Sequence, residues 1–181
     1  MKAKHNLLLK PQSTIETCLS MCLISLLENK GIKVNKNEEI NIFIEGIKFT
    51  KIDYSTGHLV YICKNYNVEI EQIIDYPIFY KLLSEYKYPN NFILSNKKID
   101  KNFINRISDK LPFIIYIDQY YLAGIHLPHF AILEKINNST ATILDPWDGE
   151  RKIISTLIFF RAIQSLRNKL KISPKIITLS S

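Results

Sequence analysis

The chain has 181 residues, of which 46% are hydrophobic and 23% are charged, and its formal net charge is +7. This length fits one domain or two lobes that share a core, and the composition is typical of a soluble globular protein. The basic residues are spread along the chain and form no long run, so the charge alone does not indicate nucleic-acid binding. We therefore predict no nucleic-acid partner.

The cysteines and the apolar segments indicate a cellular location. Three cysteines at irregular spacing argue against a disulfide framework and for a reducing compartment. The apolar run at 7–9 is too short for a secretory signal. No stretch of about 18 apolar residues occurs, so we expect no membrane-spanning segment. Together these features predict a cytoplasmic protein.

The clearest predicted helix lies between Thr17 and Gly31. Threonine is a preferred residue at a helix N-cap, and glycine is preferred just after a helix C-terminus. Apolar residues fill most of the circumference, which is typical of a helix buried in the core. They recur at spacings of three and four: Leu19, Cys22, Leu23, Leu26 and Leu27.

The remaining elements before residue 110 are mostly helical. An alternating pattern over 68–74 predicts one strand, and Pro77 is placed as the first residue of a helix. His58 is expected on the surface of its helix. Apolar spacing predicts helices at 38–46, 55–66, 78–87 and 100–110.

Beyond residue 110 the pattern changes to strands. We predict that the strands at 129–136 and 140–145 form a hairpin, and we expect the last strand, at 175–180, at a sheet edge. Ser155 is predicted to cap a helix at 156–170. We predict an α+β fold in a single domain of residues 1–181, with a helical lobe of about 1–110 and a mostly antiparallel sheet lobe of about 111–181. The predicted strands are 112–118, 129–136, 140–145, 150–155 and 175–180.

Cys18 is the candidate nucleophile. The free N–H groups and the partial positive charge at a helix N-terminus favour a thiolate, and Cys18 lies there. Cys22 and Cys63 lie on the apolar faces of their helices, so we expect both to be core residues.

A nucleophilic cysteine needs a base and a group that orients the base. His129 begins one strand of the predicted hairpin and Asp145 ends the other, so the two residues fall at the same end of neighbouring strands. Their side chains can then form a hydrogen bond. Gln12, six residues before Cys18, is a candidate donor to an oxyanion, together with the Cys18 N–H.

These motifs resemble those of the C39 and C39-like cysteine peptidases. The similar features are Gln12 spaced five residues from Cys18, the segment 129-HFAIL-133 and the segment 144-LDPWDG-149. The family consists of papain-like thiol proteases, the best known of which process the leader peptides of bacteriocin exporters. The resemblance extends over about residues 8–155.

The resemblance implies a papain-like fold, with the cleft between the two lobes, and a peptide or protein substrate. It implies that Cys18 is the nucleophile, His129 the base, Asp145 the orienting acid and Gln12 the oxyanion donor, with no cofactor. The family usually has glycine directly after the cysteine, whereas this chain has Leu19. The segment between Cys18 and His129 is also longer than in the exporter domains. The substrate and the oligomeric state stay open.

Three alternatives remain. The fold can serve as an inactive peptide-binding module, which Leu19 supports, or the same triad can catalyse acyl transfer. A zinc site would use Cys18, Cys22, His126 and His129, but the histidine spacing is shorter than usual and Cys22 belongs to the apolar face of its helix. We therefore predict no metal.

Overall fold

The structure is a computed structural model that describes residues 7–49 and 53–180. A short 3-10 helix spans Ser108–Lys110. The α-helices are α1 (Cys18–Asn29), α2 (Glu38–Phe49), α3 (Tyr54–Tyr66), α4 (Pro77–Leu83), α5 (Lys101–Arg106), α6 (Tyr120–Ala123) and α7 (Thr156–Asn168). The strands are β1 (Glu69–Ile74), β2 (Phe92–Asn96), β3 (Phe113–Asp118), β4 (Pro128–Ile136), β5 (Thr140–Asp145), β6 (Glu150–Ser155) and β7 (Lys175–Ser180).

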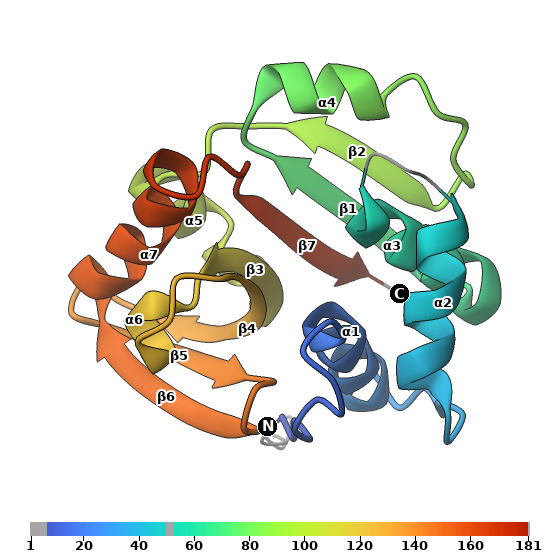
Figure 1. Cartoon of the computed structure of the whole chain (residues 1–181), viewed down its shortest axis with the longest axis horizontal. Coiled ribbons are helices and arrows are strands. Elements are labelled where there is room, and N and C mark those ends of the chain that lie inside the picture. Colours follow the sequence, from blue (N-terminus) through green and yellow to red (C-terminus); the bar gives the residue numbers. More distant parts are fainter. Residues whose placement is uncertain (1–6, 50–52, 181) are drawn as a thin grey trace.

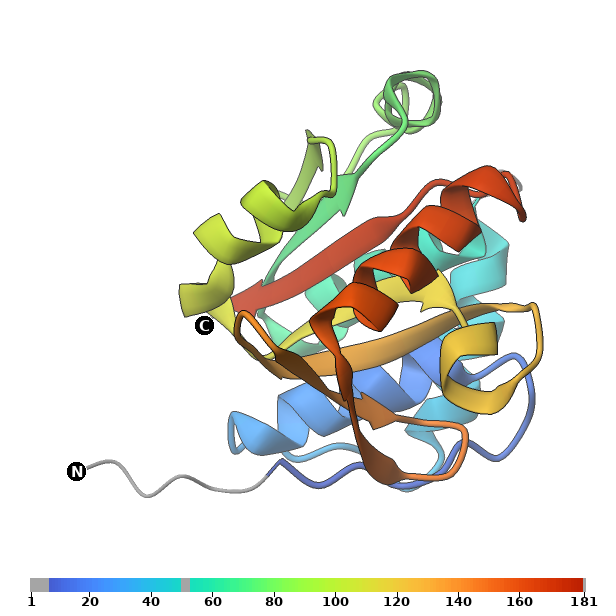
Figure 2. The ribbon, with the colours of Figure 1, turned by 90° about the vertical axis from the view of Figure 1, so that its left-hand side faces the viewer.

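The strands form one seven-stranded sheet in the order β2-β1-β7-β3-β4-β5-β6. The β1–β2 pair is parallel, and every other neighbouring pair is antiparallel. Helices cover both faces, and Figure 2 shows α1 on one side of the sheet and α7 on the other. The α+β class predicted from the sequence is confirmed. The sheet includes β1 and β2 from the predicted helical lobe, and the single-domain organisation stays a prediction.

Helix α1 is the buried central helix that the apolar pattern predicts. Leu19, Leu23 and Leu27 are each 0% exposed and pack in the core cluster that α1 forms with the sheet, α2 and α3. Gly31 follows the helix with a φ of 76°, as expected of a glycine at that place. The expected cap is wrong in one respect, because the Thr17 hydroxyl donates to Glu39 Oε1 at 2.6 Å and makes no bond to the helix N–H groups.

Strand β7 was expected at a sheet edge, and this prediction is wrong. It lies between β1 and β3 in the middle of the sheet (Figure 1). Ile176 and Ile177 are both 0% exposed and belong to the cores on opposite faces, which is the pattern of a central strand. Strand β2 was not predicted, since its segment is short and only Phe92 in it is buried.

The expected surface position of His58 is also wrong. His58 is 0% exposed, because α2 and α3 approach closely at two glycines. A Cβ on Gly46 would lie 1.9 Å from the His58 ring, and a Cβ on Gly57 would lie 1.9 Å from the Gly46 carbonyl oxygen. Burial lowers the pKa of His58 to about 4, although the charge of Asp53 opposes this shift. The ring is therefore a neutral core group.

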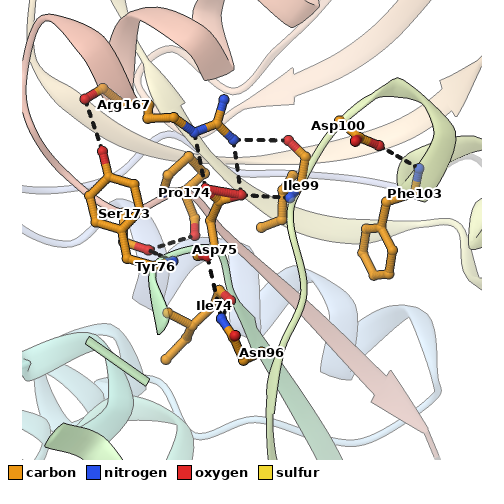
Figure 3. A network of polar contacts seen from close by, with 10 residues as sticks. All are labelled: Ile74, Asp75, Tyr76, Asn96, Ile99, Asp100, Phe103, Arg167, Ser173 and Pro174. Atoms are coloured by element: carbon orange, nitrogen blue, oxygen red, sulfur yellow. Dashed lines mark hydrogen bonds and ion pairs between the residues drawn. The ribbon is translucent and has the colours of Figure 1, made fainter. Parts of the chain in front are cut away.

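A polar network joins β1 to α7 (Figure 3). The Arg167 guanidinium donates to both oxygens of Asp75, at 2.9 and 3.0 Å, and to the Ile99 carbonyl at 3.1 Å. The Ile99 N–H donates to Asp75 Oδ1 at 2.6 Å. The network therefore fixes the helix on one face of the sheet relative to the strands β1 and β2. In the described part of the chain, no helix is both long and apolar enough to cross a membrane.

Candidate active site

His129 and Asp145 form a buried hydrogen-bonded pair at one end of the β4–β5 hairpin. His129 Nε2 lies 2.7 Å from Asp145 Oδ1, and the two side chains are 3% and 0% exposed. His129 is the second residue of β4 and Asp145 is the last residue of β5, so antiparallel pairing brings them to the same end. The bond to Nε2 leaves Nδ1 on the other edge of the ring.

The Asp145 carboxylate receives further donors. The Trp147 N–H donates to Oδ1 at 3.0 Å, and Lys152 Nζ donates to Oδ2 at 2.6 Å. Burial would raise the pKa of Asp145, but the hydrogen bond and charge of His129, followed by Lys152 and Trp147, lower it to about 2. Asp145 is therefore ionised at neutral pH. The sequence analysis did not identify Lys152. The only indication in the sequence is that Lys152 lies on the strand that follows Asp145.

Cys18 is the first residue of α1 and is 5% exposed. Helix α1 packs on β4, and the thiol is close enough to the His129 ring to affect its protonation. Burial alone would lower the pKa of His129, but the hydrogen bond to Asp145, the neighbouring Cys18 side chain and the charges of both raise it to about 9. Cys18 is therefore a neighbour of the His129–Asp145 pair, and the imidazole is protonated at neutral pH.

The other two cysteines are core residues. Burial raises the pKa of Cys22 well above its ordinary value, and the nearby charges of Cys18 and Asp145 add to this shift. Its thiol faces the Phe130 carbonyl at 3.6 Å. Burial also raises the pKa of Cys63, to about 12. Both thiols are therefore uncharged at neutral pH, and Cys22 provides a matched comparison for Cys18.

Gln12 lies in the segment that leads into α1. Its side-chain amide donates to the Thr14 carbonyl at 2.8 Å, and its backbone N–H donates to the Pro146 carbonyl at 2.6 Å. The second bond attaches this segment to the turn directly after Asp145. Gln12 therefore belongs to the same end of the molecule as the pair, and its role as an oxyanion donor stays a prediction.

His126 belongs to a different cluster. Its Nδ1 lies 2.7 Å from Asp118 Oδ2 and its Nε2 lies 2.6 Å from Lys169 Nζ, while Ser165 also donates to Asp118. The four residues of the zinc alternative are thus not assembled around one point. Within residues 7–49 and 53–180, no group of three or more histidine, cysteine or acidic side chains has the geometry of a metal site.

Two tyrosines lie near the thiol. Burial raises the pKa of Tyr54 and of Tyr116, and the charge of Cys18 contributes to both shifts. The Tyr116 ring stacks on Phe130, the residue after His129, with ring centroids 4.0 Å apart. Tyr54 lies at the start of α3, and no pattern in the sequence predicts that it is near Cys18.

Comparison with known proteins identifies the fold of the chain. No family model matches the chain, and no curated protein matches it. Among solved structures, the chain is similar to the peptidase domain of Streptococcus ComA, described as a bi-functional ABC transporter involved in a quorum sensing pathway. The identity is 15% and the TM-score is 0.54, over 97% of this chain and 98% of that domain.

The chain has a papain-like, C39-like fold. The resemblance predicted from the three motifs is thus confirmed at the level of the fold. In this papain-like framework, the first residue of the central helix is Cys18, and His129 and Asp145 lie on neighbouring strands of the sheet.

Proposed function

We propose that the chain is a cysteine peptidase that hydrolyses a peptide bond through Cys18, His129 and Asp145. The observation that supports this most directly is the buried 2.7 Å His129–Asp145 pair beside a thiol at a helix N-terminus. The protonated imidazole favours a thiolate next to it, and the helix N-terminus acts in the same direction. Asp145 stabilises the imidazolium and holds the ring in position.

In the proposed mechanism, the Cys18 thiolate attacks the carbonyl carbon of the substrate and the carbonyl oxygen becomes an oxyanion. The Cys18 N–H and the Gln12 amide donate to that oxygen. The C–N bond then breaks, and His129 transfers its proton to the leaving amine. His129 next takes a proton from water, which attacks the thioester and releases the acid and the thiolate.

Leu19 does not argue against activity. The family usually has glycine after the cysteine, and a leucine there would obstruct a cleft if its side chain pointed into it. Leu19 is instead 0% exposed and belongs to the core cluster under the sheet. Its burial removes the ground on which Leu19 favoured the inactive peptide-binding module.

The test is labelling of the full-length protein by a thiol-directed peptide probe, a peptidyl chloromethyl ketone, read by intact-mass spectrometry. We expect one label on the wild type, none on Cys18→Ala, and an unchanged rate on Cys22→Ala. Cys22 is the matched control because it is a buried thiol one turn along the same helix. Absence of labelling in the wild type, or equal loss in both variants, would favour the inactive module. Addition of a primary amine to a peptide cleavage assay then separates hydrolysis from acyl transfer.

A further inference from the structure

Lys152 makes close contacts with two carboxylates beside the candidate triad. Its Nζ lies 2.6 Å from Asp145 Oδ2 and 2.7 Å from Asp148 Oδ2, and its side chain is 19% exposed. Lys152 is on β6, seven residues after Asp145, and the hairpin turn between them carries Asp148. The lysine thus reaches back to the outer side of the Asp145 carboxylate, opposite the oxygen that holds His129.

The contact completes the hydrogen bonding of a fully buried carboxylate. Oδ1 of Asp145 accepts from His129 Nε2 and from the Trp147 N–H, and Oδ2 accepts from Lys152. Because Asp145 is 0% exposed, loss of the lysine would leave Oδ2 without this donor in a site away from water. The donors on both oxygens also fix the plane of the carboxylate.

We propose that Lys152 is a positioning residue for the peptidase: it aims the Asp145 carboxylate at His129 and offsets part of the negative charge that stabilises the imidazolium. This inference depends on the proposed function, because it assigns a role within the same triad. Lys152 acts through Asp145 and has no direct role in the bond-breaking steps.

The charges that face His129 make the direction of the effect clear. Asp145 on β5 and Cys18 on α1 act directly on the ring, and Lys152 on β6 lies between Asp145 and Asp148. Without the lysine, the negative charge of Asp145, which is hydrogen-bonded to the imidazolium, is no longer offset by the neighbouring ammonium group. Proton release from His129 to the leaving amine then becomes less favourable, since the protonated ring is stabilised more strongly.

The experiment measures the titration of the His129 ring by NMR in the full chain, with the resonance assigned by its absence in His129→Gln. We expect Lys152→Met and Lys152→Gln to raise the pKa of His129 by about one unit, as removal of one nearby charge does in a partly screened site. Lys152→Gln keeps a donor for Asp145 Oδ2, so it answers the question if Lys152→Met does not fold. Lys152→Arg keeps the charge and should restore the wild-type titration.

Arg151→Met is the matched control, because it removes a positive charge from the neighbouring residue of the same strand. Arg151 pairs with Glu134 at 2.8 Å and not with the triad, so the His129 titration should stay unchanged. A purely structural role for Lys152 would lower the melting temperature without moving this titration. An unchanged or lowered pKa of His129 in both Lys152→Met and Lys152→Gln, or an equal shift in Arg151→Met, overturns the proposal.

The two proposals fail in different ways. If the peptide probe never labels Cys18, the peptidase is excluded, whereas the NMR titration still decides whether Lys152 acts on the His129–Asp145 pair.

Discussion

The backbone N–H of Gln12 donates to the carbonyl oxygen of Pro146 at 2.6 Å. This bond joins the segment before the Cys18 helix to the turn directly after Asp145. Cys18 and Asp145, the proposed nucleophile and orienting acid, are therefore positioned by two segments that hold each other, although the two residues are 127 positions apart in the chain.

Gly149 allows this close approach, and we expect Gly149→Ala to disturb it. Gly149 has a φ of 76°, and a Cβ there would lie 3.0 Å from the Leu9 carbonyl oxygen. The left-handed conformation costs alanine about 1–2 kcal/mol, and the crowding adds about 1–3 kcal/mol. Gly31→Ala is the control, because Gly31 also has a φ of 76° but no atom within 4 Å of its Cβ position.

Urea unfolding of the two alanine variants measures the difference, and the probe-labelling rate of Cys18 shows whether the site moves with it. We expect only Gly149→Ala to slow labelling. Equal destabilisation of both variants would mean that the contact between Gly149 and the N-terminal segment contributes nothing to the free energy of unfolding.

Replacement of Asp145, the proposed orienting acid, should lower the pKa of His129 and reduce the reactivity of the Cys18 thiol. Asp145→Asn removes the negative charge that helps to raise the pKa of His129 to about 9, so that pKa should fall toward 6.5. We expect peptide cleavage to fall by about 10²–10⁴-fold at neutral pH, the range typical of lost acid–base assistance. Steady-state kinetics and the NMR titration of the ring check the two effects, and a change in neither would contradict the assigned role.

The local parts of this architecture are predictable from the sequence. The Cys18 helix has its own apolar periodicity, and one hairpin with a short turn sets the relation of His129 to Asp145. Both follow from patterns within fewer than about 20 residues, where helix spacing and antiparallel pairing apply directly. The motif resemblance then adds the overall fold, which the comparison with the solved peptidase domain confirms.

The parts that the sequence did not predict depend on contacts between distant residues. Lys175 at the start of β7 looks like the polar end of an edge strand, yet its partner is Asp53, 122 residues earlier. His58 is buried only because α2 contributes Gly46 to the contact. Lys152 pairs with Asp145 only once β6 has folded back on β5. No local pattern reports such pairings.

Stability should depend on pH through His129. Its pKa is about 9 in the folded protein against an ordinary value of 6.5. A raised pKa contributes stability that is fully present below pH 6.5 and is lost as the pH rises through about 9. We expect the free energy of unfolding to fall across this window by at most about 3 kcal/mol relative to His129→Gln.

Asp145 produces the opposite dependence at acid pH. Its pKa is lowered from 3.8 to about 2, so its contribution is present above pH 3.8 and is lost as the pH falls through about 2. Urea unfolding of the wild type and of His129→Gln between pH 6 and 10, and of Asp145→Asn below pH 5, measures both. Parallel curves for wild type and variant in either window would show that the pair is not linked to folding.

The buried pair of Lys175 and Asp53 should be the most sensitive ion pair to single substitution. Lys175 Nζ lies 2.8 Å from Asp53 Oδ1, and the side chains are 5% and 6% exposed. Burial raises the pKa of Asp53, but the charge and hydrogen bond of Lys175 outweigh this and lower it. Lys175→Met therefore leaves an uncompensated buried carboxylate, which costs about 3–5 kcal/mol.

The double variant Asp53→Asn with Lys175→Met should be more stable than Lys175→Met alone, because it removes the uncompensated charge as well. Lys48→Met is the surface control: Lys48 and Glu45 are 62% and 45% exposed, so its loss should cost less than about 1 kcal/mol. Thermal and urea unfolding of the variants give the comparison. If Lys175→Met costs no more than Lys48→Met, Asp53 is protonated or reaches water in the variant, and the pair does not stabilise the fold as an ion pair.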